Sequence, residues 1–247
     1  MALGHNPSIV TSGLMLCLDA GNPRSYPGSG SNWFNAGPNS SYYATIYASP
    51  TYTSGTNGYF NLDGSTQYFL TPNLTNIVLG NWPVSCELFF YSNTVINNDF
   101  VYLAGMRSSS DNYLPIGIGI EARNSWVGNY LGAYGVTGIS NYPRYTASSP
   151  GSIVNNTWYH VVQTATAADT KLYLNGVLVS TSSSTQTFYT SATTQLGIGC
   201  AGMTSSTLEY PAYTSNQRIS VCRFYNIELS ASQVSQNFNA LRGRYGI

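Results

Sequence analysis

The sequence predicts an all-β protein, a two-sheet antiparallel sandwich with one short helix near the carboxyl end. Three observations support this prediction. Short runs have an apolar residue at every second position, turn residues separate the runs, and one amphipathic segment follows them. The chain has 247 residues, enough for one large β domain, and we find no linker or repeat. We therefore expect a single domain over 1–247, with 1–12 as an amino-terminal arm.

Alternation of apolar and polar residues marks each expected strand. In the first run, Leu14, Leu16 and Leu18 share one face, as residues two apart do in a strand. The run 84–91 alternates in the same way and places Glu87 on the opposite face, where water can reach it. The expected strands are 13–19, 58–64, 84–91, 100–105, 114–121, 158–164, 195–199 and 219–225.

The dipeptide Asn175-Gly176 is the strongest turn signal. These residue types adopt the two positive φ angles of a type I′ turn, and apolar residues flank them. We therefore expect a hairpin over 171–179, with the run 158–164 as its neighbour in the sheet.

One helix is expected, over residues 230–242. Ser230 and Gln233 fit a capping box, in which each side chain accepts a hydrogen bond from the other residue's backbone. The apolar stripe of this helix consists of Val234, Phe238 and Leu241. Gly243 follows and can end the helix.

Charged residues make up only 7% of the chain, and nine Lys and Arg balance nine Asp and Glu. A typical soluble protein has about 25% charged residues. Nucleic-acid binding is disfavoured, because neutralising phosphates requires a basic stripe. No apolar run approaches the roughly 20 residues of a membrane span, so membrane insertion is not expected. The amino terminus also lacks the basic and apolar regions of a signal peptide.

The four cysteines match no zinc-binding or Cys-x-x-Cys spacing. Cys17, Cys86 and Cys222 each lie inside an apolar run, so we expect buried, reduced thiols that pack as small apolar groups. A disulfide pair is the alternative. Reduced thiols favour folding in a reducing cytoplasm.

Five segments follow one another along the chain in an order that is typical of one protein family. They are Gly13 to Ser29; Trp33; Phe60-Asn61-Leu62-Asp63-Gly64; Asn156-Thr157-Trp158-Tyr159-His160-Val161-Val162 with Leu172-Tyr173-Leu174-Asn175-Gly176; and Ile219 to Ser230. Together they resemble the LamG-like jelly roll of the concanavalin A-like lectin/glucanase superfamily, over nearly the whole chain. Cys222 and Phe224 stand where that family usually has Val and Ile. The resemblance implies a jelly-roll order of strands.

The stretch 230–247 also resembles the tail of such domains in tailed phages and large algal viruses. With the low charge and the expected lack of a signal peptide, it favours a non-enzymatic structural or decoration protein of a virion capsid or tail. Such a protein assembles in the host cytoplasm and contacts other virion proteins or a second copy of itself. The alternative is a carbohydrate-binding module or adhesin for host glycans, and a remote alternative is a glycoside hydrolase.

Catalytic residues are not expected. Glucanases of this fold use closely spaced Glu and Asp residues, and glycoside hydrolysis requires two facing carboxylates. Glu87 is the only acid in its strand, and the other acids are scattered. His160 is expected to be a core histidine with a hydrogen-bonding neighbour rather than part of a Ser-His-Asp triad.

Calcium is the cofactor that the resemblance raises, because relatives often hold Ca²⁺ at a sheet rim. The family's Asp-Gly-x-x-Asp-Tyr motif appears here as Asp63-Gly64-Ser65-Thr66-Gln67-Tyr68, without the second acid. Asp63 can instead accept hydrogen bonds from its own turn. Asp63, Asp111 and Asp99 are the candidate ligands; otherwise we expect no metal and no cofactor.

Tyrosine is in excess, with 21 residues, and we expect long loops at 23–41, 141–152 and 204–216. Tyr42, Tyr43 and Tyr47 are also expected in a loop. An exposed Tyr ring suits a sugar face and equally a protein interface, or it covers the edge of the sandwich. The candidate binding residues are Tyr142, Arg144, Tyr145, Tyr210, Tyr213 and Asn216.

Overall fold

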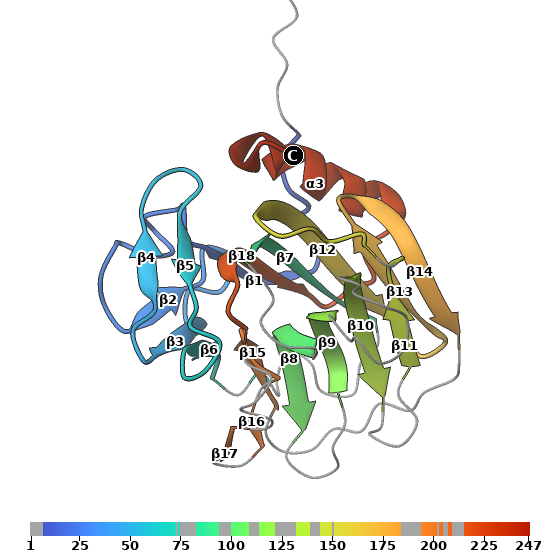
Figure 1. Ribbon diagram of the computed structural model, residues 1–247, viewed down its shortest axis with the longest axis horizontal. Coiled ribbons are helices and arrows are strands. Elements are labelled where there is room, and N and C mark those ends of the chain that lie inside the picture. Colours follow the sequence, from blue (N-terminus) through green and yellow to red (C-terminus); the bar gives the residue numbers. More distant parts are fainter. Residues whose placement is uncertain are drawn as a thin grey trace, which may run out of the picture.

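The computed structural model describes residues 7–72, 74, 83–93, 100–108, 114–121, 132–138, 144–149, 151–183, 194–201, 203–204, 207–208 and 215–247. Within them, two antiparallel eight-stranded sheets face each other, and two further strands pair as a small sheet of their own. The helix α3 (Ala231–Tyr245) covers the outer face of one sheet (Figure 1). The predicted all-β sandwich with a carboxyl-terminal helix is confirmed.

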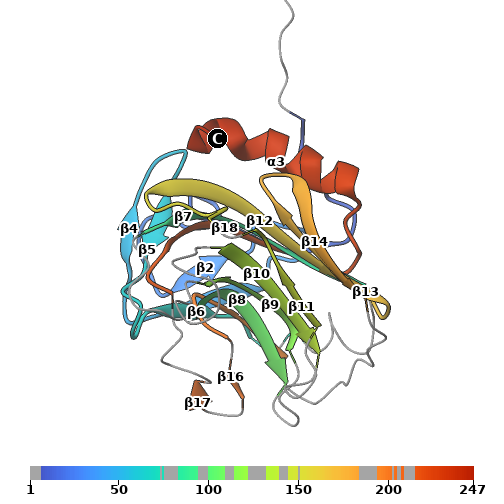
Figure 2. The same cartoon turned by 45° about the vertical axis from the view of Figure 1, so that its right-hand side comes forward.

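Sheet A carries the helix on its outer face, away from β8, β9 and β10 of the other sheet (Figure 2). Its strand order is β14-β13-β12-β7-β18-β5-β4, and β1 also pairs with β18. The strands are β1 (Leu14–Asp19), β4 (Thr51–Thr53), β5 (Tyr59–Asn61), β7 (Val84–Ser92), β12 (Thr157–Ala165), β13 (Asp169–Leu174), β14 (Val177–Ser183) and β18 (Arg218–Tyr225).

Sheet B has the order β11-β10-β9-β8-β15-β6-β3-β2. The strands are β2 (Asn32–Phe34), β3 (Tyr43–Tyr47), β6 (Tyr68–Leu70), β8 (Phe100–Ser108), β9 (Leu114–Glu121), β10 (Gly132–Gly138), β11 (Arg144–Ala147) and β15 (Thr194–Ile198), and the small sheet pairs β16 (Met203–Thr204) with β17 (Thr207–Leu208). The segments expected as loops therefore contain the strands β2, β11 and β17, and Tyr43 and Tyr47 lie in β3. These strands are too short to show alternation, so only pairing with their neighbours reveals them.

The hydrophobic core lies between the two sheets. Trp33, Phe60 and Phe69 are completely buried, and their ring centroids lie 5.0, 5.1 and 4.9 Å apart. Burying one large apolar side chain contributes about 1.5–3 kcal/mol to stability. Leu16 and Leu18 belong to this core, as the alternation predicted. Leu14 does not share their face as expected: it packs in a second cluster with Cys17 and Val234, because the β1–β18 register shifts between Leu14 and Leu16.

The predicted hairpin joins β13 to β14. Asn175 has a φ of 48° and Gly176 a φ of 79°, as a type I′ turn requires. A Cβ atom at Gly176 would lie only 2.9 Å from Cδ1 of Phe238. The turn therefore packs closely against α3, and glycine is needed here for both reasons.

The capping box of α3 is confirmed. Ser230 Oγ accepts from the Gln233 backbone at 3.3 Å, and Gln233 Oε1 accepts from the Ser230 backbone at 2.9 Å. The helix does not end at Gly243 as predicted but continues to Tyr245, and Gly246 adopts the left-handed conformation. A glycine inside a helix costs only about 1 kcal/mol, and burial of Tyr245 outweighs this cost.

The described part of the amino-terminal arm is docked on α3. Val10 is buried, and its backbone N–H donates to Asn237 Oδ1 at 2.7 Å. The four cysteines are buried and free, as expected. Among the described helices, none combines the length and the apolar character of a membrane span.

Candidate functional site

Three of the six predicted binding residues, Tyr142, Tyr210 and Tyr213, fall outside the part that the structure describes. The candidate calcium ligands Asp99 and Asp111 also lie outside it. Arg144 and Tyr145 were expected in a loop, but their backbone begins β11 and pairs with Thr137 and Val136 of β10. The loop prediction was wrong for these two residues, because their backbone N–H and C=O groups form hydrogen bonds in the sheet instead of with water.

Asn216 is half-buried and holds the segment before β18 against the end of β7. Its backbone carbonyl accepts from Asn93 Nδ2 at 2.6 Å, and its side-chain oxygen accepts from Gln217 Nε2. A Cβ atom at Gly64 would lie 2.8 Å from the Asn216 Cβ. The structure thus gives Asn216 contacts within the chain.

Asp63 closes its own turn. Its Oδ1 accepts from the backbone N–H groups of residues 65–67 at 2.9, 2.9 and 3.0 Å, and its Oδ2 accepts from the Thr66 hydroxyl at 2.8 Å. Burial raises the pKa of Asp63, but these donors outweigh burial and hold the pKa below its usual value. Among the described residues, no group of three His, Cys, Asp or Glu side chains could hold a metal ion.

Glu87 of β7 is completely buried beneath α3, which corrects the expectation that water reaches it. Its Oε1 lies 3.0 Å from both Arg223 Nη1 and His160 Nε2. Its Oε2 accepts from the Tyr225 hydroxyl at 3.2 Å and from Asn237 Nδ2 at 2.8 Å. We call these residues the buried polar cluster. The alternating pattern placed Glu87 on the correct face of the strand, but did not reveal the helix above it.

The buried polar cluster joins β7, β12, β18 and α3. Burial alone would raise the pKa of Glu87, but the adjacent Arg223, followed by His160, lowers it to about 2. A buried carboxylate with such partners stays ionised. The prediction that His160 is a core histidine with a hydrogen-bonding neighbour is confirmed.

The other acids with described side chains are also engaged. Asp19 pairs with Arg244, with oxygen–nitrogen distances of 2.7 and 2.9 Å. Asp169 and Glu228 both pair with Lys171, at 2.7 and 2.5 Å. Each of these carboxylates therefore serves an ion pair within the fold.

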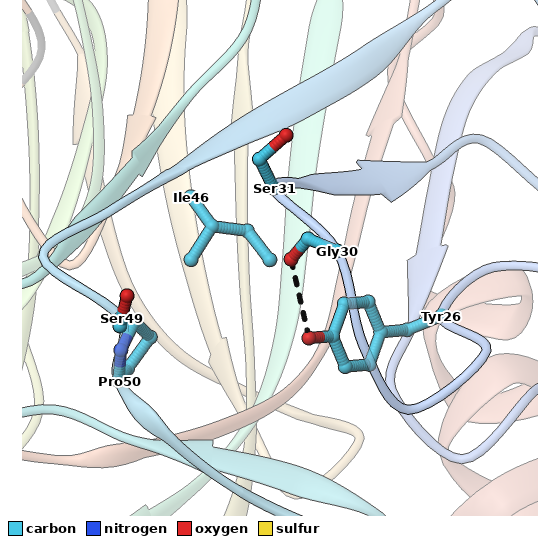
Figure 3. A pocket seen from close by; sticks show the side chains of 6 residues that line it. All are labelled: Tyr26, Gly30, Ser31, Ile46, Ser49 and Pro50. Carbon is cyan, nitrogen blue, oxygen red and sulfur yellow. Dashed lines mark hydrogen bonds between the residues drawn. The ribbon is translucent and has the colours of Figure 1, made fainter.

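A cavity of about 290 Å³ opens where β3 turns into β4. Its lining residues are Tyr26, Gly30, Ser31, Ile46, Ser49 and Pro50. Figure 3 shows Tyr26 and Gly30 on one side, Ser49 and Pro50 on the other, and Ile46 between them. The volume is just below the roughly 300–1,000 Å³ typical of small-molecule sites.

The lining of this cavity is uncharged. The Tyr26 ring packs edge-on against Tyr52 and Phe60, with centroids 4.7 and 4.8 Å apart, and its hydroxyl donates to the Gly30 carbonyl at 3.4 Å. Tyr26, Ser31 and Ser49 carry hydroxyl groups, and Ile46 supplies an apolar surface. This combination suits a neutral ligand with both hydroxyl groups and apolar faces.

The rim of the cavity has an unusual backbone. Ala48 and Ser49 have positive φ angles of 55° and 49°, although both carry side chains. Such conformations cost on the order of 1–3 kcal/mol each and often occur at binding sites. Beside this turn, the Tyr47 and Tyr68 rings stack with centroids 4.6 Å apart and an interplanar angle of 13°.

Two eight-stranded antiparallel sheets with this order, capped by a helix, define a lectin-like jelly roll. Residues 62–235 match the Laminin_G_3 family, described as the concanavalin A-like lectin/glucanases superfamily. The match spans more than half of the chain, so the chain belongs to this family. A search of curated protein sequences finds no significant match.

Solved structures share this fold. The binding domain of botulinum neurotoxin DC in complex with SialylT has a TM-score of 0.67 and 13% identity over 94% of this chain and 52% of that one. Trypanosoma rangeli sialidase in complex with 2,3-difluorosialic acid has a TM-score of 0.66 and 15% identity over 95% of this chain and 34% of that one. This chain thus spans about half of the toxin domain and a third of the sialidase, and the similarity is one of fold.

Proposed function

We propose that this chain is a non-enzymatic carbohydrate-binding domain, and that the cavity beside the β3–β4 turn receives a neutral sugar. The observation that carries this proposal is an uncharged cavity with hydroxyl groups of Tyr26 and Ser49 at its wall and rim. Sugars present hydroxyl groups at their edges and C–H groups on their faces. Similarity in fold to a toxin binding domain in complex with SialylT supports the proposal.

The absence of catalysis is part of this proposal. Glycosidases hold two carboxylates about 5–9.5 Å apart across the scissile bond. Glu87 is buried under α3 and paired with Arg223, and the other acids whose side chains the structure describes are engaged in ion pairs or in the Asp63 turn. These partners support a binding role rather than hydrolysis.

A glycan array followed by calorimetry tests the sugar-binding role. Ser31→Trp should fill the cavity and weaken binding of the best glycan at least tenfold. Ser40→Trp, at an exposed residue that does not line the cavity, should leave the affinity unchanged. An array without hits, or equal affinities for the two variants, would contradict the proposal.

We also propose that the chain is a structural subunit of a virion, attached through the edge strand β14. Val177, Leu178 and Val179 are 64%, 46% and 38% exposed at the end of sheet A. An uncharged apolar edge strand can pair with a second copy of itself, because no like charges meet in the antiparallel arrangement. Paired copies would suit a repeating particle surface, assembled in the host cytoplasm.

Sedimentation velocity over a range of concentrations tests this attachment. The chain should form dimers that Leu178→Lys dissociates, because a lysine on an edge strand opposes pairing. The chain should also be present in purified particles, and the same variant should be lost from them. A monomer at all concentrations that is absent from particles would remove the virion role.

A further inference from the structure

Beyond the carboxyl end of α3, the outer face of sheet A carries a row of side chains across five adjacent strands. The register pairs Thr51 with Asn61, Asn61 with Arg218, Arg218 with Tyr91, and Tyr91 with Trp158. Four strand spacings of about 4.8 Å make this row about 19 Å long. We call it the cross-strand row; its strands β4, β5, β18, β7 and β12 follow one another in Figure 1.

Arg218 at the centre of the row is half-buried and has no carboxylate partner among the described residues. Its guanidinium carbon lies 4.3 Å from the ring centroid of Tyr91 and 5.0 Å from that of Tyr59. Its Nε is buried, and no described residue accepts a hydrogen bond from it. Within the described part, the other half-buried or buried arginines pair with acids: Arg223 with Glu87, and Arg244 with Asp19.

Among the described residues, Arg218 therefore has aromatic contacts but no counter-charge. Taking a cation partly out of water costs free energy, which a counter-charge normally offsets. The faces of Tyr59 and Tyr91 offset part of this cost, but they do not accept the planar hydrogen bonds of the guanidinium. Its geometry matches a carboxylate, which accepts two parallel N–H donors.

The neighbours of Arg218 suit a sugar. Trp158 lies edge-on to Tyr59 and Tyr91, with centroids 5.9 and 5.5 Å away, which gives an aromatic surface. Asn61 accepts from Asn93 Nδ2 at 3.1 Å, and its own amide N–H groups donate to no described residue. Aromatic faces next to amide N–H donors fit the C–H faces and oxygens of a saccharide.

We propose that the cross-strand row is a second binding site, specific for an acidic glycan whose sugar carboxylate pairs with Arg218. The ring of that sugar lies against Tyr91 and Trp158, and Asn61 donates to one of its oxygens. This site is separate from the cavity, shares no residue with it and binds a ligand of different charge. Loss of one site therefore leaves the other testable.

Calorimetry with paired probes tests the carboxylate. Sialyllactose is compared with lactose, and oligogalacturonate with its methyl ester, so that each pair differs in an acidic group. Binding of at least one acidic probe should exceed its neutral partner. Arg218→Gln should weaken it by about ten- to a hundredfold, the range for a hydrogen bond to a charged group, and Arg218→Lys should retain only part of the wild-type affinity for the acidic probe. Arg242→Gln, which removes an exposed charge, is the matched control.

A second variant tests the site without removing the arginine. Asn61→Asp places a carboxylate directly opposite Arg218, where cross-strand pairs of opposite charge attract. The new carboxylate should form an ion pair with the Arg218 guanidinium and so compete with the ligand. Binding of the acidic probe should be abolished, and the melting temperature of the variant should be equal to or higher than that of the wild type. Asn61→Ala should weaken binding only a few fold.

The same measurements can overturn the proposal. Equal binding of acidic and neutral probes, or no binding of either pair, contradicts it. Stronger binding of dextran sulfate than of both carboxylates, with equal losses for Arg218→Gln and Arg242→Gln, shows unspecific charge attraction. Unchanged affinity of Asn61→Asp also contradicts the proposal, even if Arg218→Gln fails to fold.

Discussion

Glu87 shows how a single buried charge can depend on its neighbours. Its carboxylate receives hydrogen bonds from Arg223, Tyr225 and Asn237, so the fold replaces the water that burial removes. Removing any one donor leaves part of the charge unsatisfied. Breaking a buried charge network of this kind is strongly destabilising.

The pKa of Glu87 gives stability a defined dependence on pH. The pKa is about 2 in the folded chain, against 4.5 for an ordinary Glu. The unfolded state therefore binds more protons between these values, and stability falls as pH drops from about 4.5 toward 2. The loss should reach about 3 kcal/mol by linkage, measured by urea unfolding at a series of pH values.

Glu87→Gln provides the control for this pH dependence. The variant should be less stable at pH 7, because a neutral amide pairs poorly with Arg223, and its stability should vary less between pH 4.5 and pH 2. An unchanged pH profile would show that other carboxylates cause the acid sensitivity.

Asn237 links the amino-terminal arm to the buried polar cluster. Its Oδ1 accepts from Val10, and its Nδ2 donates to Glu87. Asn237→Ala should lower the free energy of unfolding by about 2–4 kcal/mol, because it leaves the buried Val10 amide without its partner and takes away one of the two donors to Glu87 Oε2. Hydrogen exchange should also become faster at Val10, whereas Asn239→Ala, on the same helix, should leave Val10 protected.

The elements differ in how far the sequence could predict them. A long strand such as β7 (VSCELFFYS) alternates clearly, because one face meets the core. The strands β2, β4 and β6 have three residues each, too few to show a period, and only long-range pairing forms them. Gly243 suggested an earlier helix end, but packing of Tyr245 against Phe89, with ring centroids 4.9 Å apart, extends α3 beyond it.

The capping box of α3 can be tested at the level of the element. Ser230→Ala removes the acceptor for the Gln233 N–H and should destabilise the protein by about 1 kcal/mol. Ser232→Ala, two residues further, removes only the contact between its hydroxyl and that of Ser230. It keeps both hydrogen bonds of the capping box and should change stability by only a few tenths of a kcal/mol. Thermal unfolding followed by circular dichroism measures both changes, and equal shifts would argue against the cap.

At the scale of the whole molecule, neither proposed site could be located from local sequence. The cavity joins the loop after β1 to the β3–β4 turn, which lie about 20 residues apart in the sequence. The cross-strand row combines residues from Thr51 to Arg218, and only the register of the sheet makes them neighbours. The excess of tyrosine did indicate aromatic surfaces, but the tyrosine residues that the structure describes lie on strands as well as in loops.

The buried thiols give a test of the whole fold. Burial raises the pKa of Cys17, and a hydrogen bond with Cys86, followed by burial, raises that of Cys222, so little reactive thiolate forms. In the native protein, none of the four free cysteines should react rapidly with Ellman's reagent. All four should react after unfolding in guanidinium, and fewer than four would indicate a disulfide.

The position of β18 within sheet A has a consequence for synthesis. β1, β5 and β7 all precede β18 in the chain, yet β18 lies against each of them. On the ribosome these strands are synthesised first, and the backbone groups that pair with β18 have no partner until residues 218–225 emerge. Unpaired apolar strands associate readily with other chains. Prompt completion of translation, or shielding by a chaperone, is therefore what this topology requires of the cell that makes it.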